Sequence, residues 1–372
     1  MGLLLAGVAA TPAHAETIRS QQWHLDAMKA DEIWKISTGK GVTVAVIDSG
    51  ITEIPELVGQ FLPGKTFSTQ GAEEPVDKGG HGTGIAALIA GTGKHPSGDG
   101  AYGLAPDAKI LPLRVPDDQE WETPSWAAAI RYAADSDAKV INISLGRSSK
   151  PEEDAARAEA VKYALSKGKL VFAAAGNTGN GTNKVQYPGA TPGVVGVAAV
   201  DSRGEPTSES QHGPQIDLAA PGTDIVMACA SNSGLCKTHG TSDSSALASA
   251  SAALLWAAHP DWTNNQVLRV LLNTAGKPVD GSGRNDYVGY GVVRPRVALQ
   301  TPGDPGPADV YPLPDLAAAA PPPTQAPAPG DKAATAPKSD GSTTPWTGIG
   351  LGLAACVLIG GAVTAALVRR NR

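Results

Sequence analysis

The chain has 372 residues, of which 30 are basic and 36 acidic, so its formal net charge is −6. An apolar fraction of 41% allows a packed core and argues against disorder of the whole chain. Without a basic excess, nucleic acid is not expected as the main partner. Three cysteines are too few for a disulfide-dense scaffold or a four-cysteine zinc site within the chain.

The N-terminal segment, residues 1–15, is apolar and ends in Ala13-His14-Ala15. This small-x-small pattern is typical of a signal-peptide cleavage site, so we assign the segment to export. No basic residue precedes Arg19, and we therefore expect the signal peptide to begin upstream of Met1. An ordinary apolar N-terminus is the alternative.

Residues 16–40 carry several large apolar side chains: Trp23, Leu25, Met28, Ile33 and Trp34. Such residues indicate that the segment packs on the domain that follows it in the chain. An inhibitory propeptide remains the alternative interpretation of the same stretch.

The body of the chain, residues 16–300, contains five short apolar or β-branched runs. They cover residues 42–47, 110–113, 140–143, 170–175 and 194–200. Each predicts a strand that is buried on both faces. Helical stretches lie between them, such as 151–167, which opens with three acidic residues and ends before Gly168. The alternation predicts an α/β fold with a mainly parallel central sheet, whose functional groups gather at the carboxyl edge.

Two polar residues stand where these elements meet that edge. Asp48 follows the first predicted strand, and His81 lies in the glycine-rich stretch Gly79-Gly80-His81-Gly82-Thr83-Gly84 before an apolar helix. A carboxylate at one nitrogen of an imidazole fixes its tautomer and stabilises its cation. A turn aspartate and a lone structural histidine are the ordinary alternatives.

Two further candidates complete the set. Asn177 follows the strand at 170–175, where its amide can donate to a developing oxyanion. Ser242 opens a helix of small residues, whose N-terminus supplies backbone N–H groups and a positive dipole end. Each has a plain alternative, a turn asparagine and a capping serine. All four residues together, at predicted strand-to-loop edges, favour nucleophilic catalysis.

Residues 301–345 contain 12 prolines, including Pro321-Pro322-Pro323, among Ala, Asp, Thr and Ser. This composition predicts an extended linker that is partly polyproline II. It could hold the domain away from a membrane at up to ~3.1 Å per residue.

Residues 346–368 follow, and the 22 positions from Thr347 carry no charge. A stretch of this length predicts a transmembrane helix; a buried core helix is the alternative. Residues 369–372 then contain Arg369, Arg370 and Arg372, which the positive-inside rule places in the cytoplasm. We therefore expect a single-pass protein of the cell membrane with an extracellular catalytic domain.

The order Asp, His, Ser along the chain resembles that of the subtilisin-like serine peptidases, the S8 family. Four motifs carry this resemblance over residues 20–300, with lesser matches at Ser144-Leu145-Gly146 and Ala220-Pro221-Gly222. The four are Val44-Ala45-Val46-Ile47-Asp48-Ser49-Gly50, His81-Gly82-Thr83-Gly84, Ala173-Ala174-Ala175-Gly176-Asn177 and Gly240-Thr241-Ser242.

The resemblance implies a subtilisin-like three-layer fold and a serine endopeptidase. By it, Asp48, His81 and Ser242 form a catalytic triad, and Asn177 is the side chain of the oxyanion hole. Ser144-Leu145-Gly146 would pair with an extended substrate, and Ala174-Ala175-Gly176 would line the S1 pocket. The family usually has proline four residues after the nucleophile, where this chain has Ala246. Asp243 is also unusual beside the serine, although an acid suits the first turn of a helix.

The whole layout also resembles the mycosins, the membrane-anchored peptidases of actinobacterial type VII secretion systems. This implies polypeptide substrates, a membrane and the secretion machinery as partners. The second hypothesis is a scaffold that stabilises a membrane secretion complex, with cleavage secondary. A scavenging peptidase released into the medium fits a membrane tether poorly.

Cys229 and Cys236 are seven residues apart in a domain that we expect to be exported, which favours a disulfide. Two free buried thiols are the alternative, and Cys356 is interpreted as a small apolar residue of the membrane helix. No cofactor is expected to be required for catalysis. Asp99, Asp107 and Asp118 could suggest structural calcium, but they form no spaced loop of carboxylates. Whether the chain binds structural calcium is left open. We interpret His239 as structural.

Overall fold

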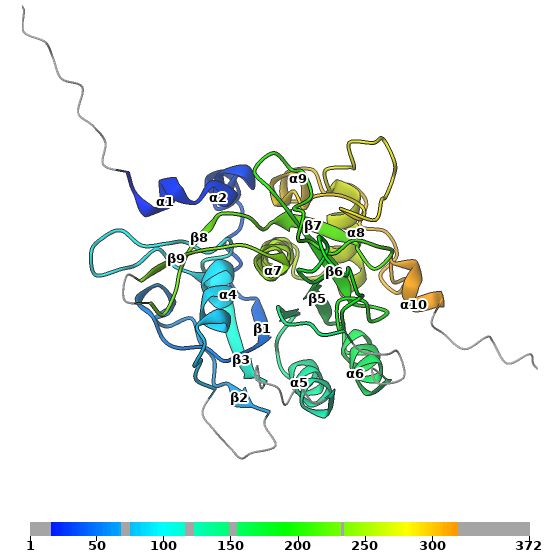
Figure 1. The fold of residues 1–372 in the computed structure, drawn as a ribbon, viewed down its shortest axis with the longest axis horizontal. Helices are drawn as coiled ribbons and strands as arrows, with labels where there is room; N and C mark the ends of the chain where they lie inside the picture. The colour runs from blue at the N-terminus through cyan, green and yellow to red at the C-terminus, as the bar shows by residue number, and fades with distance from the viewer. Residues whose placement is uncertain (1–15, 68–74, 116–122, 149–154, 232–233, 319–372) are drawn as a thin grey trace, which may run out of the picture. The chain divides into compact units, whose positions relative to one another are not determined.

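The computed structural model describes residues 16–67, 75–115, 123–148, 155–231 and 234–318 (Figure 1). Among these residues, no helix has both the length and the apolar character needed to cross a membrane. The predicted signal peptide, the membrane helix at 346–368, the basic tail at 369–372 and Cys356 lie outside the described residues.

A seven-stranded parallel sheet forms the centre of the domain, with the order β2-β3-β1-β4-β5-β6-β7. The strands are β1 (Thr43–Asp48), β2 (Lys65–Thr66), β3 (Lys109–Arg114), β4 (Val140–Ile143), β5 (Leu170–Ala174), β6 (Val195–Val200) and β7 (Leu218–Pro221). The predicted α/β fold with a mainly parallel sheet is confirmed. Val44 of β1 is in register with Ile110 on one side and Val140 on the other, so the first three predicted runs are direct neighbours.

Helices cover both faces of the sheet (Figure 1). Alternate side chains of a strand point to opposite faces. Val44 and Val46 accordingly pack in the cluster that includes α4 (His81–Ala90) and α7 (Thr241–Ala258), whereas Ala45 and Ile47 pack in the cluster that includes α5 (Thr123–Asp135) and α6 (Ala155–Ser166). Of the helix predicted at 151–167, the structure describes residues 155–167.

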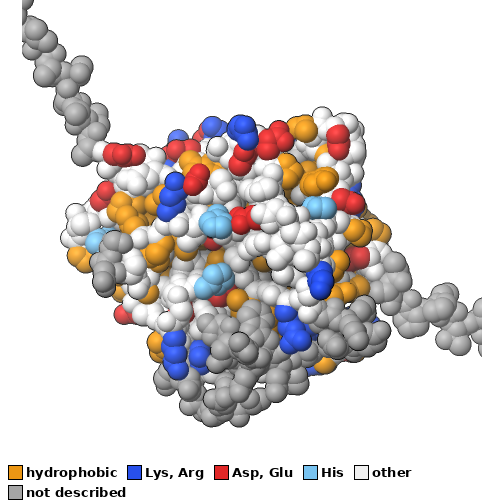
Figure 2. Space-filling model, in the orientation of Figure 1, with side chains coloured by type: hydrophobic (Ala, Val, Ile, Leu, Met, Phe, Trp, Pro, Cys, Tyr) orange, Lys and Arg blue, Asp and Glu red, His pale blue; other side chains and the backbone are white. Residues whose placement is uncertain are grey.

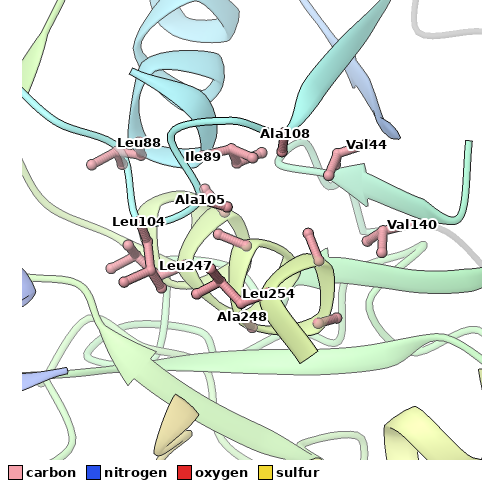
Figure 3. Close-up of a cluster of buried hydrophobic side chains, with 14 of the residues drawn as sticks. Val44, Leu88, Ile89, Leu104, Ala105, Ala108, Val140, Leu247, Ala248 and Leu254 are labelled. Atoms are coloured by element: carbon pink, nitrogen blue, oxygen red, sulfur yellow. The ribbon is translucent and has the colours of Figure 1, made fainter. Parts of the chain in front are cut away.

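The larger core cluster lies around α7 (Figure 3). Leu247, Ala248 and Leu254 of this helix are fully buried with Leu88 of α4 and Val140 of β4. Helix α7 consists largely of Ala and Ser, and almost all of its residues are buried. A helix that is buried all round needs no polar face, and its small side chains allow close packing on the sheet.

The remaining elements are short or peripheral. They are α1 (Ile18–Gln21), α2 (Trp23–Ala27), α3 (Ala30–Ile33), η1 (Pro55–Leu57), the hairpin β8 (Ile225–Ala228) with β9 (Leu235–Thr238), α8 (Asn264–Thr274), α9 (Pro295–Gln300) and α10 (Pro314–Ala318). Helix α8 begins with a capping box in which Thr263 and Gln266 bond each other's backbone.

The N-terminal segment packs on the domain, as its apolar residues predict. Leu25 and Ile33 are fully buried. The indole of Trp23 donates to the carbonyl of Thr223 at 3.0 Å, and the amide of Gln22 donates to the carbonyl of Tyr102 at 2.8 Å. No residue from 16 to 40 lines the cavity that holds His81 and Ser242 among the described residues, so this segment does not block it.

Residues 301–318, the first part of the predicted linker, also pack on the domain. Arg269 donates to the carbonyls of Pro305 and Pro307 at 2.7 and 2.9 Å. Leu313 is buried, and the hydroxyl of Tyr311 donates to the carbonyl of Gly193 at 2.8 Å. An argument based on the high proline content predicts an extended linker and does not identify these anchoring residues. The structured part therefore extends beyond residue 300.

Candidate active site

Asp48 and His81 lie in direct contact at the carboxyl edge of the sheet. Asp48 is the last residue of β1 and is fully buried, and His81 is the first residue of α4. His81 Nδ1 is 2.7 Å from Asp48 Oδ1, which also accepts a hydrogen bond from the backbone N–H of Ser49 at 2.8 Å. With a proton on Nδ1, the imidazole donates to the carboxylate and its Nε2 is left to accept a proton.

This approach requires glycine at position 82. A side chain there would collide with the carbonyl of Gly50 and lie about 3.0 Å from the side chain of Asp48. Gly80, just before the helix, has φ of 84°, in the left-handed region that favours glycine. The glycine-rich stretch therefore brings the imidazole against the carboxylate.

The electrostatic surroundings of His81 favour its cation. The carboxylate of Asp48 raises the pKa of His81, burial opposes this, and Asp243 and Asp77 add to the rise, so that the pKa reaches about 9. The side chain is still 43% exposed, so the ring can be reached from outside the domain.

Asp77, which the motif analysis does not single out, holds the start of α4. Its Oδ1 accepts from the N–H groups of Gly79 and Gly80 at 3.0 and 2.8 Å, and from Ser49 Oγ at 2.9 Å. Its Oδ2 accepts from the N–H and hydroxyl of Thr83 at 2.9 and 2.7 Å. Burial raises the pKa of Asp77, but these hydrogen bonds outweigh it and leave the pKa below its usual value. A sequence signal was present, since an acid before a helix satisfies its free N–H groups.

Ser242 is the second residue of α7 and is half-buried. Its hydroxyl donates to the carbonyl of Ser144 at 2.9 Å, and Ser144 Oγ donates in return to the carbonyl of Ser242 at 3.0 Å. His81 and Ser242 line the same cavity. Among the described residues, Ser242 Oγ donates to Ser144 and forms no hydrogen bond with the imidazole of His81. Such catalytic contacts often tighten only when substrate binds.

Asn177 is tied to the start of α7 by Thr241. Its Oδ1 accepts from the backbone N–H and the hydroxyl of Thr241, both at 2.9 Å. The hydroxyl of Thr241 also accepts from the N–H of Gly176 at 3.0 Å. Since the oxygen of the amide is occupied, the NH₂ end is available to donate, and Asn177 lines the cavity with Ser242.

The predicted substrate-binding residues belong to two segments, Ser144-Leu145-Gly146 and Ala174-Ala175-Gly176. Ser144 is bonded to Ser242, as described above, while Ala174 and Ala175 are buried. A side chain added at Gly146 or Gly176 would meet Oε1 of Gln186 at 3.0 or 2.5 Å. Gln186 thus lies against both predicted substrate-binding segments, a position that no sequence motif signals. Leu145 is partly buried and packs against the cluster of α5 and α6.

A neutral network supports the Ser144 side from behind. Asn142 on β4 is fully buried and donates to Ser144 Oγ at 2.9 Å. Its Oδ1 accepts from Ser245 and Ser249 of α7 at 2.8 and 3.0 Å. Hydrogen bonds among these four residues connect the end of β4 to α7 and so help to fix the position of Ser242 relative to Ser144.

The cavity beside His81 and Ser242 has a volume of about 430 Å³. Its far wall is the β8–β9 hairpin, where Cys229 and Cys236 form a disulfide with Cα atoms 5.8 Å apart. Asp243 and His239 also line it. Among the described residues, no group of three or more His, Cys, Asp or Glu side chains has an arrangement that could hold a metal ion.

Comparison with known proteins places this geometry in a family. Residues 39–291 match the model of the subtilase family, peptidase S8. Mycosin-1 of Mycobacterium tuberculosis is 33% identical, over 84% of this chain and 80% of that protein. Thermitase of Thermoactinomyces vulgaris is 36% identical, over 55% of this chain and 72% of that protein.

Comparison with solved structures supports the same family assignment. The crystal structure of MycP1 from Mycobacterium smegmatis superposes with a TM-score of 0.68 at 30% identity, covering 81% of this chain and 89% of that one. A second structure, described as MycP1 from the ESX-1 type VII secretion system, has the same TM-score and identity and covers 90% of its chain. The chain has the subtilisin-like α/β fold and belongs to the subtilase family of serine endopeptidases.

Proposed function

We propose that Asp48, His81 and Ser242 form the catalytic triad of this endopeptidase. The observation that carries the proposal is the 2.7 Å contact between Asp48 and His81 at the wall of a cavity that Ser242 and Asn177 share. Ser242 Oγ forms a bond to the carbonyl carbon of a peptide while its proton passes to Nε2 of His81. Asp48 keeps the ring in the required tautomer and balances its charge.

The second half of the reaction releases the two products in turn. His81 gives its proton to the nitrogen of the scissile bond, the C–N bond breaks, and the C-terminal part of the substrate leaves. Water then attacks the acyl-enzyme, again with His81 as the base, and Ser242 is regenerated. No electron transfer and no cofactor enter this balance.

The negative oxygen of the tetrahedral intermediate is assigned to the NH₂ of Asn177 and a backbone N–H near Ser242. Thr241 occupies the oxygen of the Asn177 amide, which fixes the amide and leaves its NH₂ end available to donate without a change at the moment of reaction. For Asn177→Ala we expect kcat to fall by ~10²–10³. An unchanged kcat would remove Asn177 from the mechanism.

The acyl part of the substrate is assigned to Ser144-Leu145-Gly146 and Ala174-Ala175-Gly176, here named the acyl side. An extended peptide beside these segments would use main-chain hydrogen bonds for affinity. Gln186, which lies against Gly146 and Gly176, then sets the depth of the S1 pocket and its preference for a polar partner.

The experiment is active-site labelling of the full chain with a fluorophosphonate, followed by hydrolysis of a peptide library. Ser242→Ala should abolish both signals without loss of folding. Ser251→Ala is the matched control, because within the described part of the chain the hydroxyl of this buried serine on the same helix bonds only the carbonyl of Leu247. Labelling or hydrolysis that persists in Ser242→Ala would refute the assignment.

We also propose that the peptidase works at the cell membrane in type VII secretion. Support comes from the similarity to MycP1 of the ESX-1 type VII system and from the apolar segments at 1–15 and 346–368. The same similarity favours a second candidate, a scaffold within a secretion complex. Complementation distinguishes the two, since a Ser242→Ala chain that restores secretion would make the scaffold role the essential one.

A further inference from the structure

The cavity of about 430 Å³ lies on one side of Ser242 only. His81, Asn177 and Ser242 line it, together with Gly79 and Gly80, the β8–β9 hairpin and the first turn of α7. No described residue of the acyl side lines it. If the proposed function holds, His81 protonates the nitrogen that leaves, so the space beside His81 and away from the acyl side receives the leaving peptide. We name this cavity the leaving-side pocket.

The walls of the leaving-side pocket are apolar, and its charges are acidic. Ile85, Met227 and the Cys229–Cys236 disulfide supply the apolar surface. Asp243 is a lining residue of the pocket although it is only 3% exposed. The described lining residues include neither lysine nor arginine.

Asp243 has one hydrogen-bond donor that holds it in place. Thr238 Oγ1, from β9, donates to Asp243 Oδ2 at 2.8 Å. Burial raises the pKa of Asp243 to about 6, while the Thr238 hydrogen bond, His81 and His239 lower it and Glu209 raises it. Above this pH the side chain is an anion with one hydroxyl partner among the described residues, and its carboxylate can accept more hydrogen bonds.

The other titratable groups around the pocket leave its field negative. His81 faces it from α4, with Asp48 and Asp77 behind, and His239 faces it with Glu209 Oε1 2.7 Å from its Nδ1. On the face that Figure 2 shows, two histidine side chains lie near the middle with acidic atoms beside them. When the imidazoles are neutral, as catalysis requires of His81, the carboxylates alone set the sign of the charge.

We propose that the leaving-side pocket binds a lysine or arginine side chain of the residue that directly follows the scissile bond, and that Asp243 selects it. The aliphatic stem would lie along Ile85, Met227 and the disulfide, while the charged end reaches the carboxylate. A side chain with an aliphatic stem and a charged end suits a pocket that has apolar walls and one buried acid. Asp243 directly follows Ser242 in the chain. An acid at this position, which is unusual beside a nucleophilic serine, therefore lies inside the pocket.

The test uses three internally quenched peptides that differ only after the scissile bond, with lysine, norleucine or glutamate there. Norleucine keeps the stem of lysine without its charge. We expect kcat/KM for lysine to exceed that for norleucine by about tenfold at pH 8 and low salt, with glutamate lowest. The ratio of lysine to norleucine should shrink in about 1 M salt, because salt screens charge pairs that water reaches.

The decisive variant is Asp243→Asn, which should bring the lysine-to-norleucine ratio to about one. Asp224→Asn is the matched control, because Asp224 pairs with Lys237 at 2.9 Å and does not line the pocket. Its φ of 51° is a conformation that asparagine tolerates. This variant removes the same charge and should keep the ratio.

The outcomes separate this inference from the proposed function. A wild-type chain with no lysine preference, or an Asp243→Asn chain that keeps it, overturns the role of Asp243 while the triad stands. A chain that cleaves no peptide and takes no fluorophosphonate overturns the proposed function, and this inference with it. Fluorophosphonate labelling of Asp243→Asn shows that a lost preference is not a lost fold.

Discussion

The two sides of Ser242 differ in the chemical type of the side chains that surround them. Behind the acyl side, Asn142, Ser144, Ser245 and Ser249 are joined by hydrogen bonds between neutral groups. Around the leaving-side pocket stand several carboxylates and two histidines: Asp48, Asp77, Glu209, Asp243, His81 and His239. One serine thus joins a neutral half and a charged half of the site.

The difference separates two tasks. The acyl side has to hold any peptide backbone in one geometry, which neutral hydrogen bonds achieve at any pH in the working range. The leaving side has to accept and return a proton, and this requires groups whose charge changes. Perturbations of pH and of carboxylates should therefore act on the leaving side, whereas truncation of the neutral network should act on stability.

The largest expected effect on stability comes from Asp77→Ala. The change removes five hydrogen bonds, four at the start of α4 and one from Ser49 after β1. We therefore expect about 3 kcal/mol of lost stability and a loss of about 100-fold in kcat/KM. Urea unfolding and steady-state kinetics measure the two. Asp107→Ala is the control, since this exposed aspartate accepts a side-chain hydrogen bond only from Thr38 in the described region. Equal effects of both variants would show that Asp77 has no special role.

The pH dependence of catalysis comes next. His81 must be neutral to act as a base, and its pKa of about 9 predicts that kcat/KM rises about 50-fold between pH 7 and pH 9. Because this pKa is raised from its usual 6.5, the stabilising contribution of His81 is complete below pH 6.5 and is lost as the pH rises through 9. A pH–rate profile and melting temperatures over the same range test both statements. A profile that is flat above pH 7 would contradict them.

Asn142→Ala tests the neutral half. The variant leaves the hydroxyls of Ser245 and Ser249 without an acceptor in the core, and we expect about 2 kcal/mol of lost stability. Chemical denaturation at several pH values is the measurement, and the loss should be the same at each. A loss that varies between pH 6 and pH 9 would break the proposed division between the two halves.

The smallest expected effect is a gain. The pKa of Asp243 is raised by burial to about 6, so its contribution to stability is complete below the usual 3.8 and is lost as the pH rises through 6. Asp243→Asn should therefore stabilise the fold by about 1 kcal/mol at pH 8 and by less at pH 5. Thermal unfolding at the two pH values measures this, with Asp224→Asn as the control. A variant less stable than the parent at pH 8 would count against a strained carboxylate.

The sequence predicts the parts of this molecule whose physics is local. A buried β-branched run such as residues 42–47 indicates an inner strand of a parallel sheet. Since parallel strands end at one edge, the positions of Asp48 and Asn177 just after two such runs are enough to place both at that edge. The structure confirms the sheet and the fold class.

The sequence does not reveal partners that are set by packing between distant segments. Ser245 and Ser249 lie four residues apart on one helix face, and Asn142 interrupts an apolar strand, yet nothing in the chain says that they meet. Gln186 and Glu209 lie in loops, and their places depend on how those loops are folded. The prolines after residue 300 suggest an open tether, whereas Arg269, Tyr311 and Leu313 hold its beginning on the domain.

That attachment determines how the domain bears a pulling force. Tension applied at residue 318 first loads Leu313, the Tyr311 hydroxyl and the hydrogen bond from the Gly193 N–H to Asp315 Oδ2 at 2.8 Å. The guanidinium of Arg269, clamped on the carbonyls of Pro305 and Pro307, bears the next share. We expect these contacts to take the load before the strands of the sheet do, because they are closer to residue 318 along the chain.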